Sequence, residues 1–237
     1  MVDASRFDAA YYRRFYEDPR TRVAAPGETR ALADFVCGYL RYADLPVRSV
    51  LDMGCGMGAW KNEIARHFPA AGYTGVEYSA YLCERFGWKP GSVDEFRSRT
   101  KFDLVICQDV LQYLADRRAA KAISNLASLC AGAMYFAVLT KKDWTENCDQ
   151  ALTDGTGYQR GGDWYRKRLR KHFINAGGGV FFRRGAGAVI CGARHKHFGH
   201  EPLGLRRELA CHGDCSVELV RSVHRRKRRQ VNIDHCP

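Results

Sequence analysis

The stretch S-V-L-D-M-G-C-G-M-G at residues 49–58 combines a short apolar run, an acid and three glycines at alternate positions. The apolar run, which ends at Asp52, is typical of a strand buried on both faces of a parallel sheet. Gly54, Gly56 and Gly58 predict a tight turn in which the backbone approaches a ligand closely, because any Cβ there would hold the ligand away. Apolar residues then recur at helical spacing. A strand, a glycine turn and a helix N-terminus together predict a site for a nucleotide-like cofactor.

The spacing of these glycines distinguishes two classes of cofactor. The dinucleotide fingerprint is G-x-G-x-x-G, because a pyrophosphate must lie against the helix N-terminus. Here the pattern is D-x-G-x-G-x-G, and the carboxylate of Asp52 would repel a pyrophosphate but favour a cationic ligand. A glycine-rich turn without a ligand is the structural alternative.

The D-x-G-x-G-x-G pattern resembles the first motif of the class I S-adenosylmethionine (SAM) methyltransferases. In that family the glycine turn passes beside the amino-acid portion of SAM, and the acid helps to hold its ammonium group, usually through water. The resemblance therefore implies cofactor contacts from Asp52, Gly54, Cys55 and Gly56. It also implies a Rossmann-like α/β fold, with a seven-stranded, mostly parallel sheet, a terminal antiparallel hairpin and helices on both faces.

A second acid ends the next predicted strand, in G-Y-T-G-V-E-Y-S at residues 72–79. Glu77 lies 19 positions after Gly58, close to where dinucleotide folds place the carboxylate that accepts both ribose hydroxyls. Two adjacent hydroxyl donors need a bidentate acceptor, so we expect Glu77 to bind the ribose of the cofactor, with Tyr78 beside it. A surface glutamate is the alternative. An acid here also disfavours NADP, whose 2′-phosphate it would repel.

The third predicted strand is short and weakly patterned, in K-P-G-S-V-D-E-F from Lys89. In the methyltransferase family, an acidic or amide side chain after this strand reaches the adenine amino group. The resemblance implies that Asp94 has this role, with Ser92 and Glu95 as alternatives.

The segment K-F-D-L-V-I-C-Q-D-V-L-Q-Y-L at residues 101–114 predicts a buried strand over 102–107, with Gln108 and Asp109 at its carboxyl edge. It resembles the fourth motif of small-molecule methyltransferases, with Tyr113 where that motif commonly has histidine. The resemblance adds Gln108 and Asp109 to the expected cofactor site. Asp109 and Tyr113 are candidates for a general base, although the catalytic residue stays undetermined. The segment lacks the [DN]-P-P-[FYW] tetrapeptide, which argues against methylation of DNA adenine or cytosine N4.

Residues 1–47 precede the first predicted sheet strand and open with an aromatic-rich helix that ends near Pro19. A second helix is expected over residues 28–42. The aromatic side chains pack either on the edge of the sheet or over the cofactor, as N-terminal helices often do in the resembling family. On the second interpretation, residues 1–47 form a helical lid and Tyr12 contacts the cofactor.

The segments after the fourth strand continue the α/β pattern. A helix is expected over residues 116–130 and a fifth strand over residues 133–140. The polar stretch 141–162 is expected to hold the acceptor substrate, because loops at this edge of a sheet often do so. An N-capped amphipathic helix with a basic exposed face is predicted over residues 163–173.

Two strands at residues 180–182 and 188–191 are predicted to form the terminal hairpin around a glycine turn. The resemblance thus covers about residues 48–192, and a SAM-binding methyltransferase domain is expected over residues 48–193.

Residues 194–237 differ from the rest of the chain, since they hold ten Lys and Arg against five acids, and six of the eight histidines. Their His and Cys side chains are possible zinc ligands, but the spacing matches no structural zinc pattern, so no metal is expected. The run R-R-K-R-R at residues 225–229 is typical of nucleic-acid binding or of a localisation signal. A solvated, mobile extension is the preferred interpretation, and nucleic acid is not favoured as a partner.

The bulk properties fit one globular α/β domain with an added segment, at 237 residues and 46% hydrophobic content. The net charge of +12 indicates either a polyanionic partner or a basic surface. No apolar run approaches the ~18 residues needed to span a membrane, and the polar N-terminal residues predict no secretory signal. The ten scattered cysteines are expected to be free thiols in a reducing cytosol, so a cytoplasmic protein is expected.

These observations predict a SAM-dependent methyltransferase with a small-molecule acceptor, attacked at an oxygen, nitrogen or carbon atom that the sequence does not identify. Methylation of RNA or protein is the nearest enzymatic alternative. A non-catalytic RNA-binding protein with a degenerate SAM fold would account for the charge. An NAD-dependent oxidoreductase would share Glu77 and the sheet, but the glycine spacing argues against it.

Overall fold

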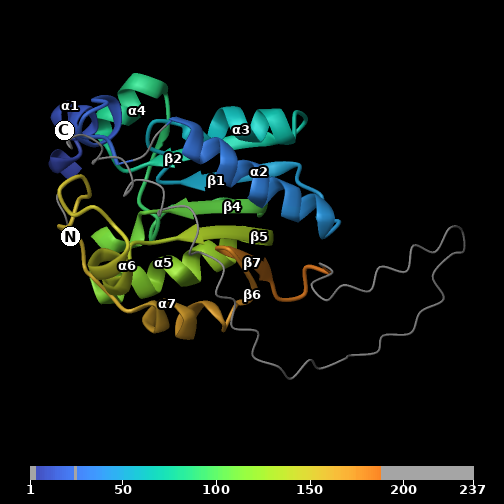
Figure 1. Cartoon of the computed structure of the whole chain (residues 1–237). Coiled ribbons are helices and arrows are strands. Elements are labelled where there is room, and N and C mark those ends of the chain that lie inside the picture. Colours follow the sequence, from blue (N-terminus) through green and yellow to red (C-terminus); the bar gives the residue numbers. More distant parts are fainter. Residues whose placement is uncertain (1–3, 24–25, 188–237) are drawn as a thin grey trace, which may run out of the picture. The chain divides into compact units, whose positions relative to one another are not determined.

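The computed structural model describes residues 4–23 and 26–187, and its strands form a single sheet (Figure 1). The strands are β1 (Ser49–Met53), β2 (Gly72–Glu77), β3 (Lys89–Pro90), β4 (Phe102–Gln108), β5 (Cys130–Ala137), β6 (Phe173–Gly177) and β7 (Val180–Arg183). Their order across the sheet is β3-β2-β1-β4-β5-β7-β6, and β7 runs antiparallel to both of its neighbours. The predicted seven-stranded, mostly parallel sheet with a terminal antiparallel hairpin is therefore confirmed.

Helices cover both faces of this sheet (Figure 1). They are the 3-10 helix η1 (Ala4–Arg6), α1 (Ala9–Tyr12), the π-helix η2 (Arg13–Glu17), α2 (Pro26–Tyr42), α3 (Ala59–His67), α4 (Ala80–Phe86), the 3-10 helix η3 (Leu111–Tyr113), α5 (Asp116–Leu129), α6 (Lys141–Glu146) and α7 (Gly162–Leu169). Helices α2 and α3 lie on one side of the sheet, and α5 and α7 lie on the other. None of the described helices is long and apolar enough to cross a membrane.

The core lies between the central strands and α5. Val50 and Leu51 of β1 have no exposed surface, and neither do Leu104, Val105 and Ile106 of β4. Helix α5 packs its apolar stripe against the face of the sheet that carries Leu51 and Val105, and this stripe consists of Ala119, Ala122, Ile123, Leu126 and Leu129. Burial of a continuous apolar run on both faces explains why these strands could be recognised from the sequence.

The strand order reverses between β1 and β4. From β1 the chain builds outward to β2 and β3, and from β4 it builds outward to β5 on the other side. At such a switch point the loops after the two central strands diverge and leave a crevice at the carboxyl edge. The glycine turn that follows β1 and residues 109–114 that follow β4 both lie at this edge.

Two strand boundaries differ from the prediction. Strand β1 continues one residue past Asp52, to Met53. Asp52 itself pairs with Gly75 of β2 and Ile106 of β4. Strand β5 begins at Cys130 and ends at Ala137, three residues before the predicted range at each end. In both cases pairing with neighbouring strands outweighs the local change in polarity.

The stretch predicted as a polar loop over residues 141–162 contains a short helix, α6. Its capping box consists of Thr140 and Asp143, each of which hydrogen-bonds the backbone N–H of the other. This T-x-x-D spacing is a helix-start signal that the sequence already carried.

The terminal hairpin is displaced along the chain relative to the prediction. Helix α7 ends at Leu169, and the next residues form strand β6, which pairs with β7 across a turn at residues 177–179. All three turn residues are glycines with positive φ. The N-cap of α7 is Gly161, whose lack of a side chain leaves no capping hydrogen bond. The predicted strand at residues 188–191 and the basic residues 194–237 lie outside the described residues.

Candidate functional site

A recess lies at the carboxyl edge of β1, β2 and β4. It is lined by the glycine turn, the end of β2, the segments after β3 and β4, and the aromatic rings of the N-terminal segment (residues 4–23). The recess has a volume of about 100 Å³, below the roughly 300–1,000 Å³ of ligand pockets. The rings of Phe7, Tyr11, Tyr12 and Tyr16 form one of its walls. A ligand the size of a nucleoside therefore requires this segment to move outward.

The glycine turn fits a ligand at Gly56. Both Gly54 and Gly56 have positive φ, 76° and 53°, a conformation that favours glycine. A Cβ on Gly54 would lie 2.3 Å from Val110 Cγ2, so this glycine is needed for packing inside the protein. A Cβ on Gly56 would meet no atom closer than 4.0 Å and would occupy space in the recess. The space that Gly56 leaves open is where a cofactor can approach the backbone.

Glu77 joins the turn to the end of β2. Its Oε2 accepts a hydrogen bond of 2.8 Å from the Gly56 N–H. Its Oε1 accepts hydrogen bonds from the N–H groups of Tyr78 and Ser79, at 2.8 and 2.9 Å. A carboxylate has about four acceptor positions, so Glu77 retains about one, on Oε2, for a ligand hydroxyl. The structure thus gives Glu77 a role in shaping the turn besides the predicted contact with ribose.

Asp52 lies in β1 beneath this turn and is 2% exposed. Its Oδ2 accepts a hydrogen bond of 2.5 Å from the Tyr73 hydroxyl. Burial raises the pKa of Asp52 to about 7, and the charge of Glu77 raises it too, whereas the Tyr73 hydrogen bond lowers it. Neither Asp52 nor the buried Cys55 lines the recess. A contact between Asp52 and a bound ligand would therefore be indirect.

Asp94 is held by an ion pair rather than presented to the recess. Arg118 donates to both carboxylate oxygens, from Nη2 at 2.6 Å and from Nε at 2.8 Å. The Ser92 hydroxyl donates a further bond of 2.5 Å to Oδ1. Desolvation acts to raise the pKa of Asp94, but the Arg118 and Ser92 hydrogen bonds outweigh it and lower the pKa. The neighbours Ser92 and Val93 line the recess, and Asp94 does not.

The end of β4 brings Gln108 and Asp109 into the recess. Gln108 Oε1 accepts a hydrogen bond of 3.0 Å from Trp60 Nε1, which fixes the orientation of its amide. Asp109 has φ of 54°, unusual for a residue with a side chain and common at functional sites. Although solvent reaches Asp109, the surrounding protein desolvates its carboxyl and raises the pKa. A carboxyl with a raised pKa in a recess is a candidate for accepting a proton.

Tyr113 belongs to a network that joins three distant segments. Its hydroxyl lies 3.1 Å from the Tyr11 hydroxyl, and both donate to Asp154 Oδ2, at 3.1 and 3.2 Å. Arg6 forms an ion pair of 2.9 Å with Asp154 Oδ1, which also accepts from the Thr156 N–H. Desolvation acts to raise the pKa of Asp154, but its hydrogen bonds and Arg6 lower it. Burial raises the pKa of Tyr113, so its hydroxyl stays protonated and serves as a donor.

The N-terminal segment is also anchored to the strand that carries Glu77. The Ser79 hydroxyl donates a hydrogen bond of 2.6 Å to the Phe7 carbonyl. The ring of Tyr12 stacks on Tyr81 with centroids 6.1 Å apart. Tyr12 also lines the recess and is 5% exposed, so the N-terminal segment forms part of its wall, and the lid remains a prediction.

The structure brings most of the expected residues to one recess: Tyr12, Gly54, Gly56, Glu77, Tyr78, Gln108, Asp109 and Tyr113. Asp52, Cys55 and Asp94 lie around it without lining it. Phe7, Tyr11 and Tyr16 belong to the aromatic opening that the sequence indicated, but no place in the site was predicted for them. Sequence reasoning missed Asp154, because the partners that join it to the recess, Arg6, Tyr11 and Tyr113, are 41–148 positions away. The described residues contain no cluster of His, Cys, Asp and Glu that could hold a metal ion.

Comparison with known proteins gives the family of this arrangement. A family model described as a methyltransferase domain matches residues 9–182. No curated protein sequence matches the chain.

Solved structures share the fold. The chain is similar to the magnesium protoporphyrin IX methyltransferase from Synechocystis PCC 6803 with bound SAM, at 20% identity over 77% of this chain and 95% of that chain, with a TM-score of 0.52. It is also similar to a SAM-dependent methyltransferase from Clostridium acetobutylicum ATCC 824, at 16% identity over 70% of this chain and 87% of that chain, with a TM-score of 0.51. It spans only 50% of the length of an amino pentose methyltransferase from Micromonospora echinaspora, at 24% identity over 46% of this chain, with a TM-score of 0.40. At these identities the solved structures establish the fold alone.

Proposed function

This chain belongs to the methyltransferase domain family and is a class I SAM-dependent methyltransferase, and on that premise we propose that it methylates a small molecule in the recess at the carboxyl edge of its sheet. The acceptor, and whether an oxygen, nitrogen or carbon atom is methylated, are not identified by any residue of the site.

The observation that carries this proposal is the covering of the recess by the N-terminal segment. Phe7, Tyr11, Tyr12 and Tyr16 face the glycine turn and Asp109 across it. Once this segment has moved outward to admit the cofactor, it can still cover a small acceptor beside the cofactor and exclude water. A macromolecular acceptor would need the same space to be open to the surface.

The residues around the recess suit the parts of SAM. We propose that Gly54, Cys55 and Gly56 present backbone to its amino-acid portion, and that Asp52 stabilises the ammonium group indirectly. Glu77 would accept one ribose hydroxyl through its remaining acceptor position, with Tyr78 beside it. The carboxylate of Asp94 is already paired with Arg118. We therefore assign the adenine contact to the neighbours of Asp94 that line the recess, and not to the carboxylate itself.

SAM supplies a sulfonium-bound methyl group that is already activated for transfer to a nucleophile. The main work of the protein is then to hold the acceptor in line with that methyl group, which can supply much of the rate. Gln108, fixed by Trp60, and Tyr113, fixed by Asp154, are oriented to position an acceptor. Asp109 is the group in the recess that can accept a proton where the acceptor must lose one. Tyr113 is less suited to that role, since burial disfavours its ionised form.

The cofactor site is tested by calorimetric titration of S-adenosylhomocysteine (SAH) into the wild-type protein and the Glu77→Ala variant. We expect micromolar binding that weakens by about tenfold or more in the variant, roughly 1.4 kcal/mol. Glu84→Ala, which removes an exposed acid on α4, is the matched control and should bind as the wild type does. Equal affinity in all three proteins would contradict the assigned role of Glu77.

The class of acceptor is tested by supplying methyl-labelled SAM and a cell extract to the wild type and to Glu77→Ala. The extract is then separated into small molecules, RNA and protein. We expect label in the small-molecule fraction with the wild type and little with the variant. Label that accumulates in RNA or protein instead would overturn the proposed acceptor class while leaving methyl transfer intact.

A further inference from the structure

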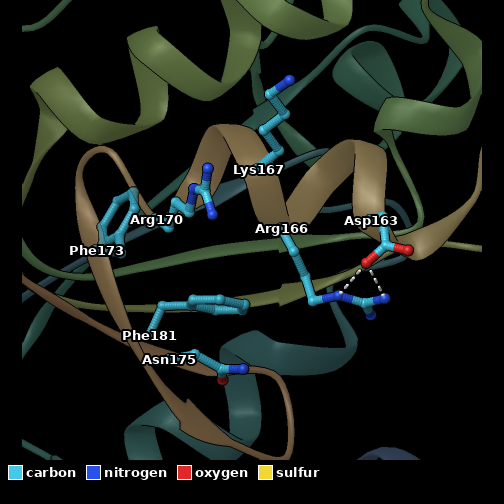
Figure 2. A pocket seen from close by; sticks show the side chains of 7 residues that line it. All are labelled: Asp163, Arg166, Lys167, Arg170, Phe173, Asn175 and Phe181. Atoms are coloured by element: carbon cyan, nitrogen blue, oxygen red, sulfur yellow. Dashed lines mark hydrogen bonds and ion pairs between the residues drawn. The ribbon is translucent and has the colours of Figure 1, made fainter. Parts of the chain in front are cut away.

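A second hollow lies between α7 and the β6–β7 hairpin, away from the glycine turn (Figure 2). It has a volume of about 520 Å³, which is within the range of ligand pockets. Its lining includes Phe173 and Phe181 on the strand side, and Arg166 and Arg170 on the helix side. No residue of the SAM site contributes to it. We name it the α7 groove.

The α7 groove carries excess positive charge. Arg166, Lys167 and Arg170 line it against a single acid, Asp163. Asp163 pairs with Arg166 at 2.6 Å, but their side chains are 95% and 63% exposed, so the pair contributes little to stability and can exchange for another anion. Among the described residues, neither Lys167 nor Arg170 has an ion-pair partner, and both are exposed. Figure 2 shows the Lys167 side chain pointing away from Phe181 and Asn175, so the groove offers the two guanidinium groups of Arg166 and Arg170 to a ligand.

The walls of the groove are fixed relative to each other. Arg184 of the hairpin donates from Nε and Nη2 to the Arg170 carbonyl, at 3.1 and 2.9 Å. Arg183 donates to the His172 carbonyl at 2.8 Å. Phe173 and Phe181 pack edge to face at 6.4 Å beneath. A groove whose two sides are tied together loses little freedom on binding.

The chemistry of the groove indicates an organic phosphate. Arg170 is the C-cap of α7 and follows Arg166 by four residues, so the two lie on the same side of the helix, and Figure 2 shows Arg166 at the level of Phe181 with its guanidinium turned toward Asp163. Planar guanidinium groups bind phosphate oxygens in pairs and also stack on flat rings. The exposed amide of Asn175 lies on the opposite rim, and its Oδ1 already accepts from the Gly177 N–H, which leaves its NH₂ to donate. Phosphate, a flat ring and an acceptor edge are together the parts of a nucleotide.

We propose that the α7 groove binds a nucleotide, with its phosphate on Arg166 and Arg170 and its base over the arginine stems and the edge of Phe181. The nucleotide is either free or part of a single-stranded nucleic acid, since both present the same chemistry. The proposal does not depend on methyl transfer, because the groove shares no residue with the SAM site.

The test is fluorescence anisotropy of a fluorescein-labelled single-stranded RNA titrated with the full chain at several salt concentrations. SAH is kept saturating, so that the cofactor site cannot take up the probe. The variant is Arg166→Gln with Arg170→Gln, and the matched control is Arg30→Gln with Arg99→Gln, two exposed arginines outside the groove. Uridine monophosphate and polyglutamate are added as competitors, and circular dichroism checks that each protein is folded.

We expect the groove variant to bind the RNA or uridine monophosphate at least about tenfold more weakly, and the control to match the wild type. With RNA, the slope of log affinity against log salt should fall by about 0.7, because the two arginines share one phosphate. Complete displacement of RNA by millimolar uridine monophosphate identifies a free nucleotide as the ligand. Persistence of the RNA complex at that concentration identifies a nucleic acid.

Three outcomes overturn the proposal. One is that neither probe binds the wild type. Another is that the groove variant binds both probes as the wild type does, which would place the binding elsewhere on the chain. The third is displacement of RNA by polyglutamate as readily as by the nucleotide, which would show a site for acidic peptides. None of these results bears on SAH binding or methyl transfer, so the two proposals fail separately.

Discussion

At the residue scale, Glu77 combines an observed role in the glycine turn with a proposed contact to ribose. Its carboxylate accepts three backbone N–H groups, one from the glycine turn and two from the residues after β2. Hydrogen bonds to a carboxylate are among the stronger ones in proteins, so Glu77 holds the turn in its shape before any cofactor arrives. The loss of affinity in Glu77→Ala will therefore combine a missing ribose contact with a looser turn.

The glycines of the turn allow these effects to be separated. In Gly56→Ala, the added methyl group meets no protein atom but lies in the recess, so we expect a folded protein with at least tenfold weaker SAH binding, measured by calorimetry. The positive φ should cost about 1–2 kcal/mol of stability. The control is Gly87→Ala, which has φ of 68°, meets no atom within 4 Å and is not in the recess. It should lose similar stability and keep its affinity for SAH.

Gly54→Ala should behave differently from Gly56→Ala, because its Cβ would lie 2.3 Å from Val110 Cγ2. We expect a larger loss of stability in thermal or urea unfolding than for Gly56→Ala. Equal losses in the two variants would contradict the assignment of Gly54 to packing and Gly56 to the ligand.

Asp52 predicts a pH dependence of cofactor binding. Its pKa is about 7, so at pH 6 the carboxyl is mostly protonated and at pH 8 it is mostly ionised. A ligand with an ammonium group nearby favours the ionised form, so SAH affinity should rise with pH through about 7 and then level off. Below pH 7 the binding should release up to one proton, which calorimetry in buffers of different ionisation enthalpy measures.

Two variants check this assignment. Asp52→Asn should abolish both the proton release and the pH dependence. Tyr73→Phe removes a hydrogen bond that lowers the pKa of Asp52, so it should move the rise in affinity to higher pH. A wild-type protein that releases no proton would show that Asp52 does not sense the ligand.

At the element scale, the N-terminal segment and the α6–α7 loop (residues 147–161) are joined through Asp154. In Asp154→Asn, the charge that holds Arg6, Tyr11 and Tyr113 is lost, so the N-terminal segment should open more often. We expect limited chymotrypsin digestion within residues 4–23 to accelerate by roughly tenfold, about 1.4 kcal/mol. Glu146→Gln, on the exposed surface of α6, is the charge-matched control.

The same network fixes how the segment responds to pH. The pKa of Asp154 is lowered in the folded protein, so its contribution is present above the ordinary pKa of about 3.9 and is lost as the pH falls through the lowered value. Wild-type digestion should therefore remain slow from neutral pH down to about pH 4, whereas Asp154→Asn should be digested rapidly throughout. Equal rates for wild type and variant would mean that Asp154 does not restrain the segment.

The elements differ in how well the sequence predicted them. Strand β4 and helix α5 were predicted to within a residue, because their apolar residues form long regular patterns and are buried. The hairpin was predicted too late in the chain, because Phe173 continues the apolar pattern of the preceding helix. In the fold, Phe173 instead pairs with Arg183 in the β6–β7 hairpin. Such pairing between distant residues has no local signature, and it decides where α7 ends.

At the scale of the whole molecule, the part of the recess that is built on the ends of strands could be predicted from the sequence, and the part that is built from peripheral segments could not. The glycine turn, Glu77, Gln108 and Asp109 follow directly after strands, so the sheet places them at one edge wherever the loops go. The network of Asp154 depends on segments that meet only in three dimensions, up to 148 positions apart. The basic exposed face of α7 could be predicted from the sequence. The hollow beside it could not, because it depends on where the hairpin lies in the fold.

The joining of the N-terminal segment to the α6–α7 loop has a consequence for engineering. The N-terminal segment, which forms one wall of the recess, and the loop that holds it contain no strand, whereas the glycine turn and Glu77 are built on the sheet. Exchanging residues 4–23 and 147–161 together, as a matched pair that keeps Arg6, Tyr11 and Asp154, would redirect the choice of acceptor without rebuilding the cofactor site. Exchanging either segment alone would leave a buried carboxylate or its partners unmatched. The two segments should therefore be exchanged together when the acceptor preference is engineered.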